Sequence, residues 1–325
     1  MNIMKILVGM GLLGMAGATS VAGCGGEDSD STTGQTAADC AQTDPLCSVG
    51  ECVALADNSG QTKFGLRMSQ LTVTRPEVLT SLTVGKIISD GVRLNLLDCR
   101  LNGQGTFNWL LELDTQAGTL RTGGALPEQD PTKGYCFVNS AAGDFQVEPV
   151  TVPAPVVDGA FSAEVGDILV PIYLQIEPPG TPIILPLRAG RIFDAKISAD
   201  NNCIGKYNSE GLLPTDRCLP SPEYPAFVDG ASLDGYITLE EADKVIVEDV
   251  AQSLCVLLAG PDLDGMYHDG GSPKRCKRDA NQAIVLQGDW CSTTNSAATA
   301  GCADSFALGA TFAASAVSIK PDVCP

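Results

Sequence analysis

The feature that most limits the folds open to this chain is a period of two in its apolar residues, repeated in short runs from about residue 64 to residue 199. In Phe107 to Asp114 the large apolar side chains fall on alternate positions. Successive side chains of a β-strand point to opposite faces, so such a run predicts a strand with one buried face. The same alternation recurs at 145–147, 161–165 and 193–197.

Gly- and Pro-containing turns separate these runs, as expected of antiparallel strands. The pattern predicts a mainly β fold, an antiparallel β-sandwich or jelly roll with Cys-rich loops. Pro171 lies in an apolar run at 168–176 and favours an edge strand there, because proline has no N–H to donate. Residues 200–237 are predicted to form a crossing loop. Residues 304–319 are predicted to form a strand that closes the sandwich, with an alanine-rich helix as the alternative.

One inserted α-helix is predicted over residues 238–259. Thr238-Leu-Glu-Glu241 has the spacing of a capping box, in which the first and fourth residues satisfy each other's backbone N–H groups. Apolar residues follow at helical spacing, and Gly260-Pro261 predict the end of the helix. We expect the disulfide-rich β-sandwich domain to cover residues 53–325, with this helix inside it.

The first residues have the layout of an export signal. Lys5 is followed by an uncharged stretch from Ile6 to Gly23, too rich in Gly and Ala toward its end to favour a membrane-spanning helix. Val21-Ala22-Gly23-Cys24 then resembles the lipobox of bacterial lipoproteins. The resemblance implies a signal peptide at 1–23, cleaved before Cys24. It also implies a diacylglyceryl thioether on that cysteine and an acylated amino terminus carrying fatty acid such as palmitate.

The same resemblance predicts where the chain resides. Residue 25 is Gly rather than the Asp that commonly retains such lipoproteins at the inner membrane, so it implies an outer-membrane anchor. We expect residues 24–39 to form a flexible tether. They comprise the lipidated cysteine and an acidic stretch without large apolar side chains. The arrangement of lipobox, tether and late cysteines is similar to that of uncharacterised exported lipoproteins of myxobacteria, which implies a secreted, envelope-bound protein but no activity.

The cysteines fit an exported chain. The chain has 13 cysteines, and 12 remain when the lipidated Cys24 is set aside. This even number predicts six disulfides, formed in an oxidising compartment. The 12 cysteines are Cys40, Cys47, Cys52, Cys99, Cys136, Cys203, Cys218, Cys255, Cys276, Cys291, Cys302 and Cys324. The Cys-rich segment 40–52 holds three of them, so at least one must pair with the domain. Cys203 with Cys218 and Cys291 with Cys302 are the shortest loops to close.

A partial calcium-binding pattern lies at residues 230–241. It is similar to the second half of an EF-hand loop, in which alternate oxygen ligands and a final Glu surround the ion. Carried over by position, the ligands would be Ser232, Asp234, the Tyr236 carbonyl and Glu241. Gly230 stands where the family has its first acid, and prolines precede the loop instead of a helix. A tight turn followed by a capped helix is the alternative.

Charge and missing motifs narrow the function. With 39 acidic against 20 basic residues the net charge is −19, which disfavours nucleic acid as a partner. Neither G-x-S-x-G nor HExxH is present, and a catalytic triad would need the single histidine, His268. Glycoside hydrolysis needs only two carboxylates, for which Glu112, Asp114, Glu148 and Glu164 are candidates.

The combined pattern predicts a lipid-anchored extracytoplasmic protein with a non-enzymatic binding or scaffolding role. An envelope protein or a glycan is the expected type of ligand, and Trp290, Tyr224, Tyr236 and Tyr267 could contact a sugar. The alternatives are an extracytoplasmic hydrolase acting on polysaccharide or peptide, and a calcium-stabilised adhesion module.

Overall fold

The computed structural model describes residues 51–80, 94–95, 101–176, 179–213, 218–221, 223–260 and 265–324. The predicted signal peptide, Cys24, the tether, Cys40, Cys47 and Cys99 lie outside these ranges.

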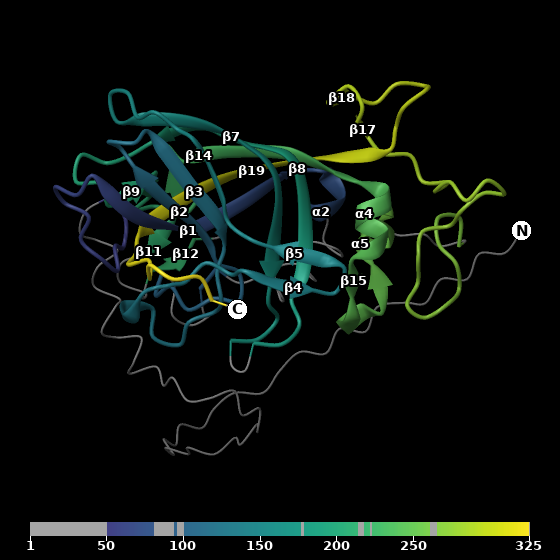
Figure 1. Cartoon of the computed structure of the whole chain (residues 1–325), viewed down its shortest axis with the longest axis horizontal. Coiled ribbons are helices and arrows are strands. Elements are labelled where there is room, and N and C mark those ends of the chain that lie inside the picture. The colour runs from purple at the N-terminus through teal and green to yellow at the C-terminus, as the bar shows by residue number, and fades with distance from the viewer. Residues whose placement is uncertain are drawn as a thin grey trace, which may run out of the picture. The chain divides into compact units, whose positions relative to one another are not determined.

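The mainly β prediction is confirmed (Figure 1). The strands are β1 (Lys63–Arg75), β2 (Trp109–Asp114), β3 (Thr119–Gly124), β4 (Ser140–Ala142), β5 (Phe145–Val147), β6 (Val150–Pro153), β7 (Ala160–Ile172), β8 (Ile183–Lys196), β9 (Cys203–Ile204), β10 (Lys206–Tyr207), β11 (Leu212–Leu213), β12 (Leu219–Pro220), β13 (Phe227–Val228), β14 (Ala231–Thr238), β15 (Ile246–Val247), β16 (Gln252–Ser253), β17 (Trp290–Cys291), β18 (Ser296–Ala297) and β19 (Ser305–Ala316). The helices are α2 (Glu77–Thr80), α4 (Leu239–Lys244) and α5 (Leu254–Ala259), with 3₁₀ turns at Pro131–Lys133 and Glu248–Val250.

One large antiparallel sheet forms the body of the fold, in the order β6-β3-β2-β1-β19-β14-β8-β7. The sheet closes on itself in a sandwich-like manner, because β7 at one end of this order contacts both β3 and β6 at the other. A Cβ atom on Gly124 of β3 would lie 2.3 Å from Pro171 of β7, so only glycine permits this close approach. Pro171 lies in the end strand β7, as its missing N–H predicts.

The main core fills the interior of this closed sheet. Phe107, Trp109, Leu111 and Leu113 all point into it and are buried, as their alternation predicts. Leu110, on the opposite face of β2, is also fully buried, because Tyr135 and the chain around residue 317 cover that side.

Strand β14 corrects the loop predicted at 200–237. Its eight residues lie in the middle of the sheet, paired with β19 on one side and β8 on the other. Ala231, Leu233 and Ile237 point inward and are buried, which is the driving force for the strand. Residues 305–316 form strand β19, so the strand prediction is confirmed there and the helical alternative is wrong.

The single helix predicted over 238–259 is also wrong in extent. It begins as predicted, with Thr238 Oγ1 accepting the backbone N–H of Glu241, but α4 ends at Lys244. Three β-branched residues follow, Val245-Ile246-Val247, which favour extended structure and form the β15–β16 hairpin. Ser253 then caps a second helix, α5, which ends before Gly260 as predicted.

Four disulfides join described cysteines: Cys52–Cys203, Cys136–Cys324, Cys255–Cys276 and Cys291–Cys302. Cys218 is disulfide-bonded as well. The predicted Cys291–Cys302 pair is confirmed and Cys203–Cys218 is wrong, since Cys203 bonds Cys52 across 151 residues of sequence.

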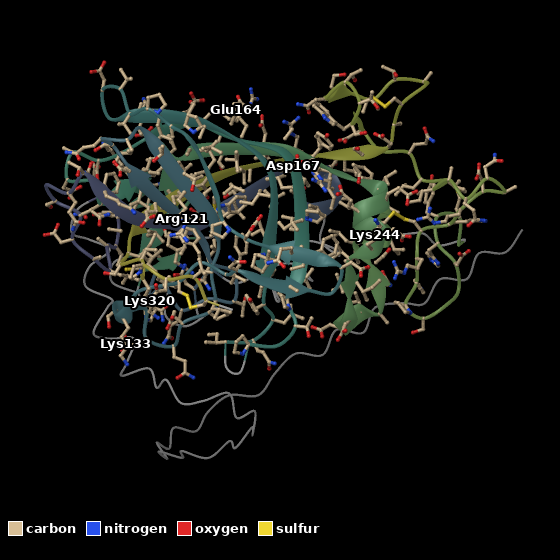
Figure 2. All side chains as sticks on the ribbon, viewed as in Figure 1. Arg121, Lys133, Glu164, Asp167, Lys244 and Lys320 are labelled. Atoms are coloured by element: carbon tan, nitrogen blue, oxygen red, sulfur yellow. A yellow bond between two sulfur atoms is a disulfide. The ribbon has the colours of Figure 1, made fainter. Side chains whose placement is uncertain are left out.

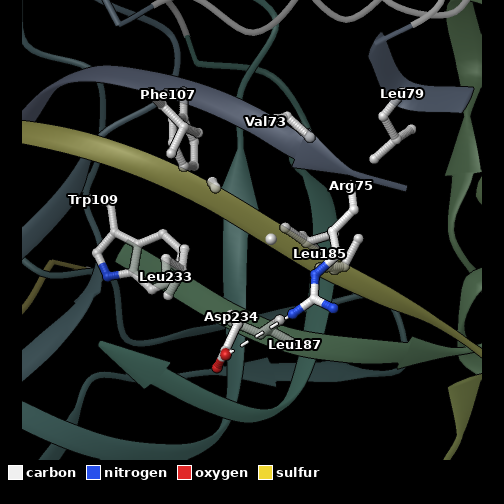
Figure 3. A pocket seen from close by; sticks show the side chains of 13 residues that line it. Val73, Arg75, Leu79, Phe107, Trp109, Leu185, Leu187, Leu233 and Asp234 are labelled. Carbon is white, nitrogen blue, oxygen red and sulfur yellow. Dashed lines mark ion pairs between the residues drawn. The ribbon is translucent and has the colours of Figure 1, made fainter. Parts of the chain in front are cut away.

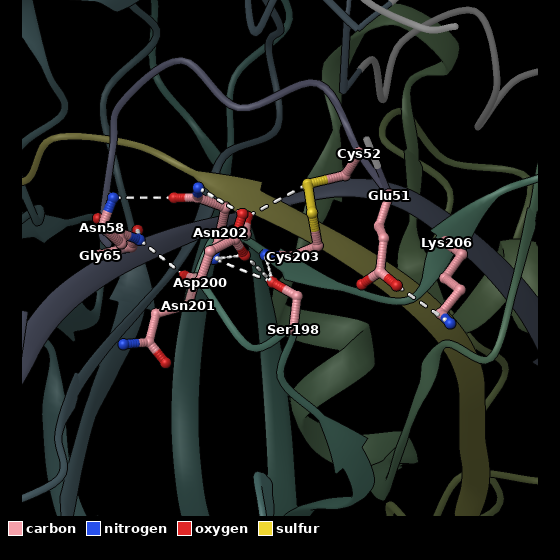
Figure 4. Close-up of a disulfide and its surroundings, with 10 residues drawn as sticks. All are labelled: Glu51, Cys52, Asn58, Gly65, Ser198, Asp200, Asn201, Asn202, Cys203 and Lys206. Atoms are coloured by element: carbon pink, nitrogen blue, oxygen red, sulfur yellow. Dashed lines mark hydrogen bonds and ion pairs between the residues drawn. A yellow bond between two sulfur atoms is a disulfide. The ribbon is translucent and has the colours of Figure 1, made fainter. Parts of the chain in front are cut away.

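The bridge from Cys52 also confirms that the Cys-rich segment is tied to the domain. Beside it, the Asn58 backbone N–H donates to the Asn202 side chain at 2.8 Å, and the Asn58 amide donates to the carbonyls of Gly65 and Asn201 (Figure 4). The chain that enters β1 is therefore fixed by both a covalent bond and buried hydrogen bonds.

Candidate binding site

An apolar pocket of about 100 Å³ lies where the interior of the closed sheet meets the helices (Figure 3). Leu185 and Leu308 mark this junction, because each packs against both the main core and the smaller core beneath α4 and α5. The pocket is lined by Leu71, Val73, Arg75, Leu79, Phe107, Trp109, Leu185, Leu187, Leu233, Asp234, Leu308, Gly309 and Ala310.

The floor of the pocket is rigid. Phe107 and Trp109 pack edge to face, with ring centroids 6.4 Å apart. The indole Nε1–H of Trp109 donates to Thr122 Oγ1 at 2.7 Å, so its polar atom is satisfied away from the cavity. This leaves only ring carbon of Trp109 to face the pocket, whose lining is apolar apart from Arg75 and Asp234.

Ion pairs on the outer face of the sheet border the pocket. Arg191 makes a bidentate pair with Asp234, at 3.1 Å through Nε and 2.6 Å through Nη2. Arg75 reaches the same carboxylate at 4.0 Å and lies over the Trp290 ring, 5.7 Å from its centroid. Both arginines are close to Asp234, so their charges are partly neutralised before any ligand approaches.

Gly309 makes this arrangement possible. It pairs with Arg75 on one side and with Asp234 on the other. A Cβ atom at Gly309 would lie 2.7 Å from Arg75 Nε. The missing side chain thus lets Arg75 cross β19 and approach Asp234.

A second ion-pair group is centred on Arg188 of β8. Arg188 donates to Glu241 through Nε at 2.9 Å and to Asp167 through Nη1 at 2.6 Å. Burial acts to raise the pKa of Glu241, but hydrogen bonds from Arg188 and Thr238, with the Arg188 charge, outweigh it and lower the pKa. The hydrogen bond to Glu241 in turn raises the pKa of Arg188. Asp167 and Glu164 project from β7 on this face (Figure 2).

Two of the four residues predicted to bind calcium, Asp234 and Glu241, belong to these two groups. Ser232, Asp234 and Tyr236 lie on the outer face of β14 rather than in a loop, and Glu241 lies in the first turn of α4. Asp234 and Glu241 would have to leave their arginines to coordinate an ion. Calcium binding stays a prediction.

Among the described residues, one group has metal-ligating atoms within 4.8 Å of one another: Asp243, Cys255 and Cys276. The two sulfur atoms are bonded to each other, which leaves the Asp243 carboxylate alone. That carboxylate accepts hydrogen bonds from Ser253 and Cys276, so the group is a structural junction rather than a metal centre.

Each of the carboxylates considered for hydrolysis is either held in other contacts or exposed. Glu112 pairs with Lys63 at 3.4 Å and Arg121 at 3.8 Å. Asp114 accepts two backbone N–H groups of the turn that follows β2. Glu164 faces Arg191 across the β7–β8 pair, and Glu148 is exposed. His268 Nδ1 lies 3.2 Å from the carbonyl oxygen of Asp269.

The aromatic residues considered for sugar binding do not all lie together. Trp290 is half-buried and donates through Nε1 to Asn295 at 3.1 Å. Tyr236 lies near it, with its hydroxyl 3.4 Å from the Ser292 carbonyl oxygen, whereas Tyr224 is exposed on another loop.

Comparison with protein-family models, curated proteins and solved structures finds no match for this chain. None of the described helices has the length and apolar character needed to cross a membrane.

Sequence reasoning missed the pocket, and with it Arg75 and Gly309. One signal was available. In the alternating run Phe306, Leu308 and Ala310, Gly309 stands at an in-between position, where a side chain that faces solvent is expected. A glycine in a strand interior marks a place where another group approaches the backbone closely.

Proposed function

We propose that the mature chain is a lipid-anchored protein of the cell envelope with a non-enzymatic binding role, and that its ligand occupies the pocket between Leu185 and Leu308. The observation that carries the binding role is the pocket itself, because an apolar cavity next to a few fixed polar groups is the usual form of a small-molecule site. The lipid anchor rests on Val21-Ala22-Gly23-Cys24 and the paired cysteines of an exported chain.

Five described carboxyl groups are poorly suited to act as the acid of a hydrolase. A glycosidase needs a carboxylic acid whose pKa is raised, so that it can donate a proton near neutral pH. The described carboxyl groups whose pKa departs from its ordinary value all have it lowered; they are Asp57, Asp130, Asp200, Glu241 and Asp304. Such groups are well suited to hold ion pairs and turns and poorly suited to act as a general acid.

The anchor is tested by Cys24→Ala. Because the thioether cannot form without the sulfur, the variant is expected to incorporate no labelled palmitate and to leave the detergent phase on partitioning. The measurement is metabolic labelling with palmitate followed by detergent extraction, with Cys24→Ala compared to the native chain. A variant that loses the label and still partitions fully into detergent would show that something other than a lipid on Cys24 holds the chain.

The binding role is tested by filling the pocket. Ala310→Leu places a larger side chain where Ala310 lines the cavity, so any small molecule that copurifies with the chain should be lost. Ala297→Leu makes the same chemical change at an exposed position of β18 and should retain it. Native mass spectrometry of the chain isolated from its host measures the added mass. Equal added mass on both variants, or none on the native chain, would count against the pocket as the site.

A further inference from the structure

We infer, resting on the proposed binding role, that the pocket takes a compact, uncharged hydrocarbon group about the size of one aromatic ring. The first reason is the lining. Leu, Val, Phe, Trp and Ala side chains form nearly all of it, together with Arg75, Asp234 and Gly309. Water against such a lining finds few hydrogen-bond partners, so an apolar guest that displaces the water breaks few protein–water hydrogen bonds.

Size sets the second limit. The cavity measures about 100 Å³. A dry engineered cavity of about 150 Å³ accommodates benzene. The pocket is smaller than that but open to solvent, so one ring, with part of it left in the mouth of the pocket, is the largest guest that fits without movement of the walls.

Charge sets the third limit. The nearest charged groups are Arg75, Arg191 and Asp234, and each arginine is paired with Asp234 on the outer face. Because the rest of the lining is apolar, a carboxylate or ammonium placed deep in the cavity would lose its water and gain no partner there. The guest group must be uncharged.

The pocket is also accessible. Leu71, Val73, Leu79, Leu185 and Leu308 each line it and each remains half-buried, so part of their apolar surface reaches solvent. A guest that covers this surface gains the free energy of removing it from water as well as the contacts inside the cavity.

The test is a titration of the full chain with benzene and, separately, with benzoate. The chain carries Cys24→Ala so that neither lipid nor detergent competes for the probe. Methyl NMR resonances of leucine and valine report binding, with Val73, Leu185 and Leu308 as the reporters. Benzene should shift these resonances to saturation, and benzoate should bind at least tenfold more weakly. Ala310→Leu and a second filling variant, Leu185→Phe, should each weaken benzene binding at least tenfold, while Ala297→Leu should leave it unchanged.

The outcomes separate this inference from the proposed function. Benzoate binding as tightly as benzene, and lost in both filling variants, would overturn the uncharged class while the pocket remained a binding site. Absence of any saturable shift with either probe, in a chain whose remaining methyl spectrum is that of a folded protein, would overturn both. Benzene binding that the filling variants do not affect would place the guest elsewhere and overturn the inference.

Discussion

Replacing Asp243 with alanine is expected to lower the free energy of unfolding by about 3 to 5 kcal/mol, because it removes the acceptor from a buried, charge-assisted network. The Asp243 side chain is nearly inaccessible to solvent. Its carboxylate accepts from Ser253 Oγ and from the Cys276 backbone N–H, both at 2.8 Å, and from Arg278 at 3.3 Å. In this way one side chain holds α4, the cap of α5 and the chain at the Cys255–Cys276 bridge.

Urea unfolding under non-reducing conditions measures the effect. Asp249→Ala is the matched control, because Asp249 is exposed and its loss should change the free energy of unfolding by less than about 0.5 kcal/mol. Equal losses for the two variants would mean that α4 and α5 are held by their apolar contacts alone.

Arg67→Met is expected to cost about 2 to 4 kcal/mol, because it leaves buried acceptors without a donor. Arg67 is 2% exposed, and burial lowers the pKa of its guanidinium without discharging it. Its Nε donates to Asn108 Oδ1 at 2.6 Å, and Nη2 donates to the carbonyls of Leu94 and Phe107. The ion pairs between described residues do not include Arg67, so its neutral partners and the Tyr135 ring, 5.4 Å away, carry the interaction.

The same unfolding assay tests this prediction. Lys196→Met is the control, since it removes an exposed cation from β8. If Arg67→Met proved as stable as the native chain, the cost of burying the charge would equal what its hydrogen bonds contribute, and the arginine would not be needed for stability.

The alternation of apolar residues was sufficient to predict the mainly β fold, because it reports burial directly. It placed Trp109 in the core and residues 305–316 in a strand. The alternation failed to predict β14. The inward residues of this strand are separated by Gly235 and by outward polar groups, and those polar groups resembled the ligands of an ion. It failed again after Lys244, where apolar spacing suited a helix and three β-branched residues favoured a hairpin.

The pocket could not be predicted for a different reason. Its walls come from residues between Leu71 and Ala310, on β1, β2, β8, β14, β19 and α2. Local periodicity says which side of a strand is buried, but the order β1-β19-β14-β8 brings together segments far apart in the sequence. The pairing of Cys52 with Cys203 follows from the same non-local order, so the shortest loop, to Cys218, was the wrong choice.

Two long disulfide loops between described cysteines overlap, and this affects how the domain would respond to cleavage by a protease. One loop runs from Cys52 to Cys203 and the other from Cys136 to Cys324. Every peptide bond between residues 52 and 324 therefore lies inside at least one covalent ring. A single cut anywhere in this range opens a ring and releases no fragment, so a nicked molecule keeps nearly its full mass until its disulfides are reduced.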